Sequence, residues 1–466
     1  MGEAVRLLGC GRSLSAIALS DYPILCMPSC DRITLPVLRF GLDFGTSNSA
    51  LAVRDDGRAR LLPLDSVAGT VMPTTLYVRR DGLALVGQAA VDSYFADSAA
   101  RGPIRRKFKL LDVHVPSTDP QQPMVRAHIL TDLDAPGRLF QSLKSFLGDP
   151  LVGRTNVFGE ARGLEELIAA ILSHVRERAF ELTGERPRAI TLGRPVRFVG
   201  EDDGVEHRAV ERLRAAAHLA GFRRVRFGLE PVAAAFAANV PTGNTLVFDF
   251  GGGTLDVCVA RRAGADIRVL ATAGADVGGD RFTELLIEEH VSPRLGGGQL
   301  PAFIANAIHD WHALSALNEK DILDALDDFS RAGGPRRELA ALVSAIELQL
   351  GYEIFRTIDD AKIRLSDFPA TILTYHRAKV DIDAKASRFR FEQLIGPSLR
   401  RIDALLEESL ALASVSSDLI DEVVTTGGSS KIPAVRALLR RRFPRATLRE
   451  ADPFGAVAAG LALLES

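Results

Sequence analysis

The chain has 466 residues, of which 47% are hydrophobic and 25% charged, and its formal net charge is −2. This length exceeds what one ordinary hydrophobic core accommodates and predicts a globular protein of several lobes. The near-neutral charge argues against a general attraction to nucleic acid or to an anionic membrane. No apolar run reaches the roughly 18 residues of a transmembrane helix, and four cysteines in a chain of this size do not indicate a disulfide framework.

Residues 1–36 differ from the rest of the chain. They hold three of the four cysteines and show no clear hydrophobic period. We interpret them as a disordered extension or as the product of a mis-assigned upstream start. A targeting signal is an alternative, although no clear small-residue cleavage site follows the apolar stretch. Cys26 and Cys30 have the spacing of a metal pair, but no second pair accompanies them.

The first half of the remaining chain alternates between strand and helix patterns. We expect strands over 38–54 (a hairpin turning at 45–48), 74–78 with 83–86, 189–192 and 225–229, and helices over 139–147, 164–183, 207–220 and 232–238. Residues 97–137 are rich in proline and predict loops.

The second half repeats the alternation. We expect strands over 246–260 (a second hairpin), 267–273, 371–392 and 422–426, and helices over 281–290, most of 296–365, 395–414, 432–442 and 453–464. This order predicts a mixed α/β fold.

The two hairpins carry related sequences. Each has an apolar strand, an aspartate, a Gly/Thr turn and a second apolar strand, at Phe40–Asn48 and at Leu246–Asp256. Glycine lets backbone N–H groups approach a phosphate closely, hydroxyl groups donate to phosphate oxygens, and aspartate holds Mg²⁺. Two such hairpins therefore predict two related halves that clamp one nucleotide. A plain hairpin turn is the alternative, but it rarely requires Asp, three Gly, Thr and Asp together.

A third glycine turn lies at Thr425–Ser430, between a predicted strand and a predicted helix. A helix N-terminus favours anions through its free N–H groups and its dipole. The alternative is an ordinary helix start with serine as the N-cap.

Together these motifs resemble the nucleotide-binding domain of the seventy-kilodalton heat-shock (DnaK-type) chaperones, within the actin-like ATPase superfamily. The matching segments are Gly41–Asn48, Leu229–Ala235, Val247–Val257, Val277–Phe282, Ala361–Ser366 and Thr425–Pro433. Their order follows the family over residues 38–466, and the chain looks most similar to the short YegD-type members. The resemblance implies two duplicated lobes, each a mixed β-sheet with flanking helices, and a nucleotide in the central cleft. Lobe I would span 37–240, and lobe II 241–466 with a helical insertion around 296–350.

The resemblance also assigns roles by position. It places Mg²⁺ near Asp43, Asp249 and Asp256. It places the phosphates of ATP or ADP near Gly45, Thr46, Ser47, Asn48, Gly251, Gly252, Gly253 and Thr254. It places the rest of the nucleotide near Gly278, Gly279, Asp359, Lys362, Ser366, Gly427, Gly428 and Ser429.

For catalysis the resemblance implies Lys144, Glu230, Asp249 and Thr254. The family has a lysine beside the γ-phosphate, which neutralises charge that spreads over the transferring group. Lys144 is our candidate, with Lys107 and Lys109 as rivals; a solvated basic face is the alternative for those two. Glu230 would orient the attacking water or link it to the metal.

The implied function is Mg²⁺-dependent ATP binding with slow hydrolysis, used as a conformational switch in the cytoplasm. Protein clients or co-chaperones would act through separate partners, without nucleic acid or membrane. Three alternatives remain open: a sugar-type small-molecule kinase, a nucleotide-dependent filament protein, and a sensor that binds nucleotide but barely hydrolyses it.

The chain also departs from the family pattern. We expect no peptide-binding domain, because no sequence for one follows the last predicted helix. Asp452-Pro453 is followed by Phe454 and Gly455, where the family has a carboxylate. Segment 296–350 looks longer than the family needs, which suggests extra packing helices or a docking surface for a partner. We interpret the arginines of 436–449 as a solvated helix face, and His309 and His312 as surface helix residues.

Overall fold

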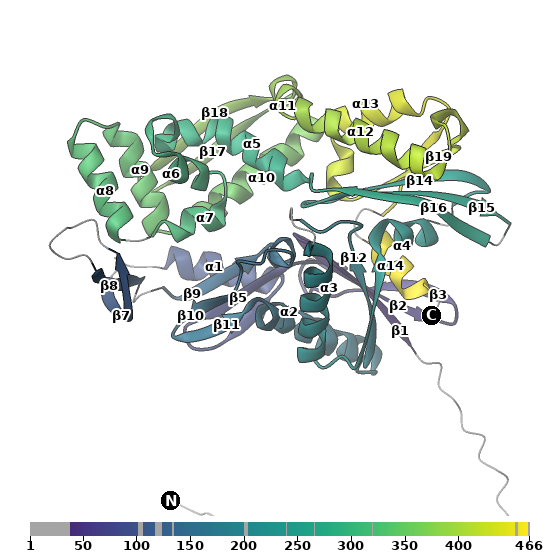
Figure 1. The fold of residues 1–466 in the computed structure, drawn as a ribbon, viewed down its shortest axis with the longest axis horizontal. Helices are drawn as coiled ribbons and strands as arrows, with labels where there is room; N and C mark the ends of the chain where they lie inside the picture. The colour runs from purple at the N-terminus through teal and green to yellow at the C-terminus, as the bar shows by residue number, and fades with distance from the viewer. Residues whose placement is uncertain are drawn as a thin grey trace, which may run out of the picture. The chain divides into compact units, whose positions relative to one another are not determined.

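The computed structural model describes residues 38–100, 106–116, 124–132, 135–199, 204–238, 240–264, 266–318, 320–452 and 455–464 (Figure 1). The interpretations of residues 1–36 and of Phe454 lie outside the described residues. No helix in these ranges is both long and apolar enough to cross a membrane.

Two sheets with the same topology form the framework, as the duplicated hairpins predict. The first has the order β13-β12-β1-β2-β3, and the second has the order β20-β19-β14-β15-β16. In each sheet the hairpin strands are antiparallel, and the two strands on the other side of the hairpin's first strand are parallel to it. The strands of the first sheet are β1 (Arg39–Phe44), β2 (Asn48–Asp55), β3 (Arg58–Leu62), β12 (Ala189–Arg194) and β13 (Arg224–Leu229), with β4 (Val71–Pro73) paired to β2. Those of the second are β14 (Gly243–Phe250), β15 (Leu255–Ala263), β16 (Asp266–Ala275), β19 (Glu422–Thr426) and β20 (Thr447–Glu450).

Strand β14 shows why the central strands are apolar on both faces. Leu246 and Phe248 point into the large core beneath helices of the second lobe, whereas Val247 points into a smaller core on the opposite face. Alternation of side chains along a strand sends neighbours to opposite faces, so a strand that is covered on both sides reads as a continuous apolar run.

Helices cover both sheets. Helices α2 (Leu164–Thr183) and α3 (Val205–Leu219) belong to the core of the first sheet. Helices α5 (Gly279–His290), α12 (Gly396–Ala413) and α13 (Pro433–Arg442) belong to that of the second. Helix α4 (Glu230–Ala237) packs against α14 (Ala456–Leu463), and α4 also contacts β14 and β15. The helix predicted over 164–183 is confirmed as α2, with the same first and last residues. The prediction succeeds because apolar residues recur at helical spacing along the whole segment.

Outer elements extend each lobe. In the first lobe, strands β6 (Ala84–Val86), β5 (Thr75–Arg79) and β9 (Gly137–Gln141) form a small sheet beside α1 (Gln88–Ala99). Two further hairpins pair β7 (Arg106–Pro116) with β8 (Met124–Asp132), and β10 (Arg154–Val157) with β11 (Glu160–Gly163). The second lobe adds α6 (Ala302–Ala307), α7 (Trp311–Ala316), α8 (Lys320–Arg331), α9 (Arg336–Glu347), α10 (Gly351–Asp367), β17 (Ala370–Arg377), β18 (Val380–Ser387) and α11 (Arg388–Leu394).

Four expectations need correction. The loops predicted over 97–137 include β7 and β8, and the helix predicted over 139–147 is strand β9 followed by the 3-10 turn Leu143–Phe146. The strand predicted over 371–392 ends at Ser387, whose side chain accepts the Arg390 N–H and caps α11. The last helix, expected in lobe II, packs on β1 and β2 of the first sheet. In the first two cases, pairing with another strand decides the structure over local preference.

Helix α14 approaches its neighbours so closely that only glycine fits. A Cβ at Gly460 would lie 1.8 Å from the carbonyl oxygen of Ala233 in α4, and a Cβ at Gly41 would lie 2.3 Å from the Ala462 nitrogen. Backbone atoms cannot move aside as the end of a flexible side chain can. The contact therefore fixes α14 across the first sheet.

We predict that Gly460→Ala lowers the free energy of unfolding by about 1–3 kcal/mol, because the added methyl group overpacks the α4–α14 contact. Differential scanning calorimetry measures the fall in melting temperature. Gly153→Ala is the matched control, since a Cβ there meets no atom within 4 Å. Equal melting temperatures for the two variants would contradict the close α4–α14 contact.

Candidate active site

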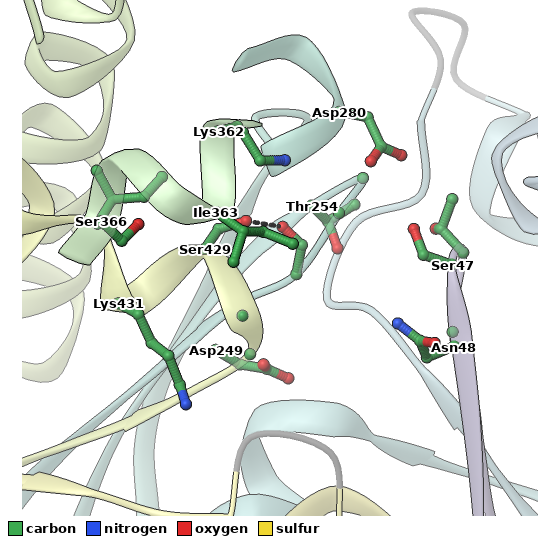
Figure 2. A pocket seen from close by; sticks show the side chains of 18 of the residues that line it. Ser47, Asn48, Asp249, Thr254, Asp280, Lys362, Ile363, Ser366, Ser429 and Lys431 are labelled. Carbon is green, nitrogen blue, oxygen red and sulfur yellow. Dashed lines mark hydrogen bonds between the residues drawn. The ribbon is translucent and has the colours of Figure 1, made fainter. Parts of the chain in front are cut away.

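A cavity of about 770 Å³ is lined by residues from both sheets (Figure 2). The residues predicted from the sequence that line it are Asp43, Gly45, Thr46, Ser47, Asn48, Lys144, Glu230, Asp249, Gly251, Gly252, Gly253, Thr254, Asp256, Asp359, Lys362, Ser366, Gly427, Gly428 and Ser429. Segments more than 380 positions apart in the chain therefore meet in one place. The side chains of Lys107 and Lys109, the rivals of Lys144, lie outside the described residues.

The glycine turns of the two hairpins face each other in this cavity. A Cβ at Gly252 would lie 2.8 Å from the Ser47 Oγ, and one at Gly253 would lie 3.0 Å from the Thr46 Oγ1. Side chains at these glycines would therefore crowd the hydroxyls of the opposite turn. The result is a narrow slot between two backbone turns with hydroxyl groups on one side, which suits the oxygens of a phosphate chain.

Gly278 and Gly279 do not line the cavity. They lie behind the second hairpin turn, where a Cβ at Gly278 would lie 1.9 Å from the Gly252 oxygen. The Gly279 N–H donates to the Gly251 oxygen at 3.0 Å, and the Ser429 Oγ donates to the same oxygen at 2.8 Å. These glycines thus support the phosphate turn from behind, and a direct contact between them and a nucleotide is not favoured.

Carboxylates gather at the end of the cavity where the two hairpins meet. Asp249 and Asp256 are directly opposite each other on β14 and β15, and Asp43 occupies the matching position on β1. Both oxygens of Asp256 are held, because the Val196 N–H donates to Oδ1 at 2.6 Å and the Thr254 hydroxyl donates to Oδ2 at 3.0 Å. Thr254 therefore positions the Asp256 carboxylate through this hydrogen bond.

Lys144 and Glu230 form a buried ion pair beside these aspartates. The Lys144 Nζ donates to the Glu230 Oε1 at 2.6 Å, and each side chain is only 9% exposed. Burial alone would lower the pKa of Lys144, but the neighbouring Glu230 and Asp43 carboxylates raise it overall. The lysine therefore stays protonated, and the pair links the first-lobe turn at 143–146 to α4.

The buried carboxylates at this end of the cavity carry more negative charge than Lys144 neutralises. Burial, and then the Glu230 carboxylate, raise the pKa of Asp43 and of Asp256 to about 7, and they raise the pKa of Asp249 well above its usual range. Carboxylates with such raised pKa values need a cation or a proton. Oxygen donors are the ligands that Mg²⁺ prefers, so the donor set of Asp43, Asp249 and Asp256 fits this ion.

The far end of the cavity is lined by α10. Lys362 reaches the cavity wall, but its ammonium group donates to the Gly279 oxygen and to the Thr283 Oγ1, each at 2.9 Å, and lies 2.6 Å from Asp359. Burial raises the pKa of Asp359, but Lys362 opposes this effect and the net shift is downward. Lys362 thus ties α10 to the start of α5. No local pattern in the sequence could reveal this tie, because Gly279 and Thr283, the partners in α5, lie about 80 positions away.

Further residues line the cavity that the sequence did not assign to a site. They are Asp280, Ile363, Asp367, Lys431, Ile432, Pro433, Arg436, Arg440 and Glu450. We expect Arg436 and Arg440 on a solvated helix face, but both border the cavity. They are four positions apart on α13 and therefore lie on one face of that helix, and this spacing is the sequence pattern that indicates a shared location. Glu450 pairs with Lys431 at 3.0 Å and with Arg436 at 3.5 Å.

The expectation for two histidines is corrected in part. His309 lies in the turn between α6 and α7, not on a surface helix, and its Nε2 is buried without a hydrogen-bond partner among the described residues. The side chain of His312 lies outside the described residues.

The raised aspartate pKa values predict a pH dependence of stability. Asp43 has a pKa of about 7 in the folded protein against 3.8 for an ordinary aspartate. The folded state binds this proton more tightly, so the free energy of unfolding falls as the pH rises from about 4 to about 7. We predict that Asp43→Asn is more stable than the wild type above pH 7, by roughly 1–3 kcal/mol.

Urea unfolding in the presence of a metal chelator, at about pH 5 and about pH 8, measures this difference. Asp55→Asn is the matched control, because Asp55 is exposed at the end of β2. If the free energy of unfolding of Asp43→Asn depends on pH in the same way as that of the wild type, the Asp43 carboxylate is not the source of the pH dependence.

Comparison with known proteins identifies the family. The family model for "Hsp70 protein" matches residues 144–295 and 349–465. The chain is 27% identical to "Chaperone protein DnaK" of Thermus thermophilus over 429 residues, which is 91% of this chain and 60% of that protein. It is 27% identical over 434 residues to "Chaperone protein HscA" of Pectobacterium carotovorum, covering 91% of this chain and 57% of that protein.

A "Chaperone protein HscA homolog" of Acidithiobacillus ferrooxidans is 30% identical over 319 residues, which is 68% of this chain and 43% of that protein. The chain spans about 60% of the length of the first of these curated relatives. Likeness to the short YegD-type members stays a prediction. Because the family model covers more than half of the chain, the protein belongs to the Hsp70 family, and its two matching lobes have the actin-like ATPase fold.

Proposed function

We propose that this protein binds Mg·ATP in the cavity and hydrolyses it slowly, so that the nucleotide state switches the conformation of the two lobes. The observation that carries the proposal is the facing pair of glycine turns, from the two duplicated hairpins, beside a buried carboxylate cluster. An adenine nucleotide with its phosphates in the slot would lie along the cavity toward α10 and α13. The names of the relatives, DnaK and HscA, support a chaperone-type ATPase.

Each residue at the phosphate end has a proposed task. The turns at 45–48 and 251–254 would hold the phosphate oxygens through backbone N–H groups and hydroxyls. Asp43, Asp249 and Asp256 would hold Mg²⁺, which supplies positive charge against the phosphate oxygens when bound. We propose that Gly427, Gly428 and Ser429 hold the ribose side of the nucleotide, and that Asp359 and Ser366 lie beside its adenosine.

Lys144 and Glu230 would act on the reacting group. Lys144 stays protonated, so its ammonium group can stabilise charge that builds on the phosphoryl group during in-line attack by water. Glu230 holds the ammonium group at 2.6 Å through one carboxylate oxygen, and its second oxygen would orient the attacking water. Both groups are already fixed by their ion pair, so little reorganisation is needed when the phosphate group reacts.

Slow turnover is part of the proposal, because a switch must stay in each nucleotide state long enough to be read by a partner. We propose protein clients or co-chaperones as those partners, and the cytoplasm as the location. We do not propose nucleic acid or membrane binding. No observation favours the kinase, filament or sensor alternatives over a chaperone-type ATPase.

We predict that Lys144→Ala lowers the single-turnover rate of ATP hydrolysis by about 100-fold or more, because the loss leaves phosphoryl charge unneutralised. ATP affinity should change only a few-fold, since the glycine turns are intact. Rapid mixing of excess protein with radiolabelled ATP and Mg²⁺ measures the rate, and filter binding measures the affinity. Asp249→Asn should in addition weaken the dependence of hydrolysis on Mg²⁺.

Lys385→Ala is the control, because Lys385 is an exposed lysine on β18 that does not line the cavity. Circular dichroism confirms that each variant is folded, since Lys144→Ala leaves Glu230 buried without its partner. Hydrolysis by Lys144→Ala at the wild-type rate would remove Lys144 from the proposal. Phosphate transfer from ATP to an added sugar, in place of water, would support the kinase alternative.

A further inference from the structure

The β17–β18 hairpin presents one face to the core of the second lobe and the other face to solvent. Its eight cross-strand pairs run without interruption along both strands. Leu373, Val380 and Ile382 on the inner face are at most 2% exposed. Because side chains alternate along a strand, this register fixes which residues share the outer face. Figure 1 shows the hairpin beside α9, which contacts β18.

Three side chains that can bind a metal ion lie together on the outer face. His376 of β17 is directly opposite Asp381 of β18, and Asp383 is two residues further along β18 on the same face. Each offers a ligand atom, and these atoms all lie within 4.8 Å of one another. The three side chains are 51%, 53% and 65% exposed, respectively, so an ion from solvent can reach them. We call these three residues the outer-face triad.

Asp381 fixes the orientation of the His376 ring. The ring Nδ1 lies 2.6 Å from the Asp381 Oδ1, and because an ionised carboxylate only accepts, Nδ1 carries the hydrogen. Arg337 of α9 donates to the Asp381 Oδ2 at 3.1 Å, so both oxygens of Asp381 are occupied. A carboxylate in this place fixes the ring and the tautomer of a metal-binding histidine. Asp381 is therefore a positioning residue of the outer-face triad and not a ligand.

The second ring nitrogen, Nε2, faces Asp383. In a neutral imidazole with its hydrogen on Nδ1, Nε2 is an acceptor. The Asp383 Oδ1 is an acceptor too, and it lies 3.5 Å from Nε2. Two acceptors that face each other at this distance repel unless a cation or a proton lies between them. A tetrahedral zinc ion, with bonds of about 2.1 Å to a nitrogen and an oxygen, would hold those two atoms about 3.4 Å apart. The observed separation is therefore that of two ligands of one ion.

We propose that the outer face of the β17–β18 hairpin binds a divalent transition-metal ion of the Zn²⁺ type, with the His376 Nε2 and the Asp383 Oδ1 as its protein ligands. Water fills the remaining positions, since this face is open. A nitrogen ligand beside a carboxylate favours Zn²⁺ over Mg²⁺, which prefers oxygen ligands.

The proposed metal site is separate from the nucleotide cavity, because no residue of the outer-face triad lines that cavity. Its two ligands lie in a segment that matches the family model, whereas Arg337 lies between the two matching segments. The arginine that holds the positioning carboxylate is thus a residue outside the family match.

Acylation of histidine by diethyl pyrocarbonate tests the proposal in the full chain. The reagent attacks an imidazole nitrogen that carries no hydrogen, and peptide mass spectrometry gives the rate at each histidine separately. Saturating Zn²⁺ should slow the reaction of His376 by about tenfold or more, because the metal occupies Nε2. His207, an exposed histidine of α3, should react at the same rate with and without Zn²⁺. Millimolar Mg²⁺ should leave both rates unchanged.

Two variants separate the ligand from the positioning residue. Asp383→Ala removes one ligand and should abolish the protection of His376 by Zn²⁺. Asp381→Asn keeps both ligands and should raise the Zn²⁺ concentration that halves the rate by about tenfold. Asp418→Ala is the matched control, because Asp418 is an exposed aspartate in the turn before β19, and it should keep the wild-type value.

Three results would overturn the proposal: a His376 rate that Zn²⁺ leaves unchanged, equal protection by Mg²⁺ and Zn²⁺, or wild-type protection in Asp383→Ala. In each case the outer-face triad forms ion pairs and no transition-metal site. A wild-type value in Asp381→Asn would overturn the positioning role of Asp381. Because the readout is specific to His376 and uses no nucleotide, neither zinc bound elsewhere in the chain nor failure of the proposed ATP binding affects the result.

Discussion

The structure is organised around buried negative charge that the polypeptide alone does not neutralise. Asp43, Asp249, Asp256 and Glu230 meet where the two hairpins converge, and Lys144 is bound to one of them. The Asp43 carboxylate of the first hairpin and the Asp249 carboxylate of the second repel each other, and burial strengthens the repulsion. A divalent cation with a phosphate chain would reverse the sign of this interaction. The same aspartates can therefore push the hairpins apart without ligand and draw them together with it.

Duplication is what brings these charges together. The two sheets have the same strand order, so the first strand of each hairpin delivers its aspartate at the equivalent point. Helices α4 and α14 pack against each other at Gly460, where even one methyl group would collide with Ala233. Close packing at this contact makes the framework stiff. A change of charge at the hairpins can therefore displace whole lobes and not only the local loops.

The sequence could reveal the features that are coded locally. Both hairpins and their aspartates, the 164–183 helix and the glycine turns follow from strand pattern, helical period and glycine placement, and the cavity contains nearly all the residues assigned to it. Features decided by distant contacts could not be read in this way. Leu139 and Phe140 form a strand because β5 lies beside them, and Gly279 supports a turn because Gly251 accepts its N–H. Local preference cannot show either partner.

Two interactions of opposite sign thus act on one cleft. At the hairpins, the force between the lobes would depend on the charge of a bound ligand. Between α1 and the start of α10, it is attractive whether or not a ligand is present, because it comes from packing of the Tyr94 and Tyr352 rings and from a hydrogen bond of Tyr94 to the Gln349 backbone oxygen. Only the first of these interactions would respond to a charged ligand, because the second involves no ionised group. Trp311, whose ring lies 5.2 Å from that of Tyr352, belongs to the segment between the two family-matching ranges, so residues outside the family match build part of this second contact.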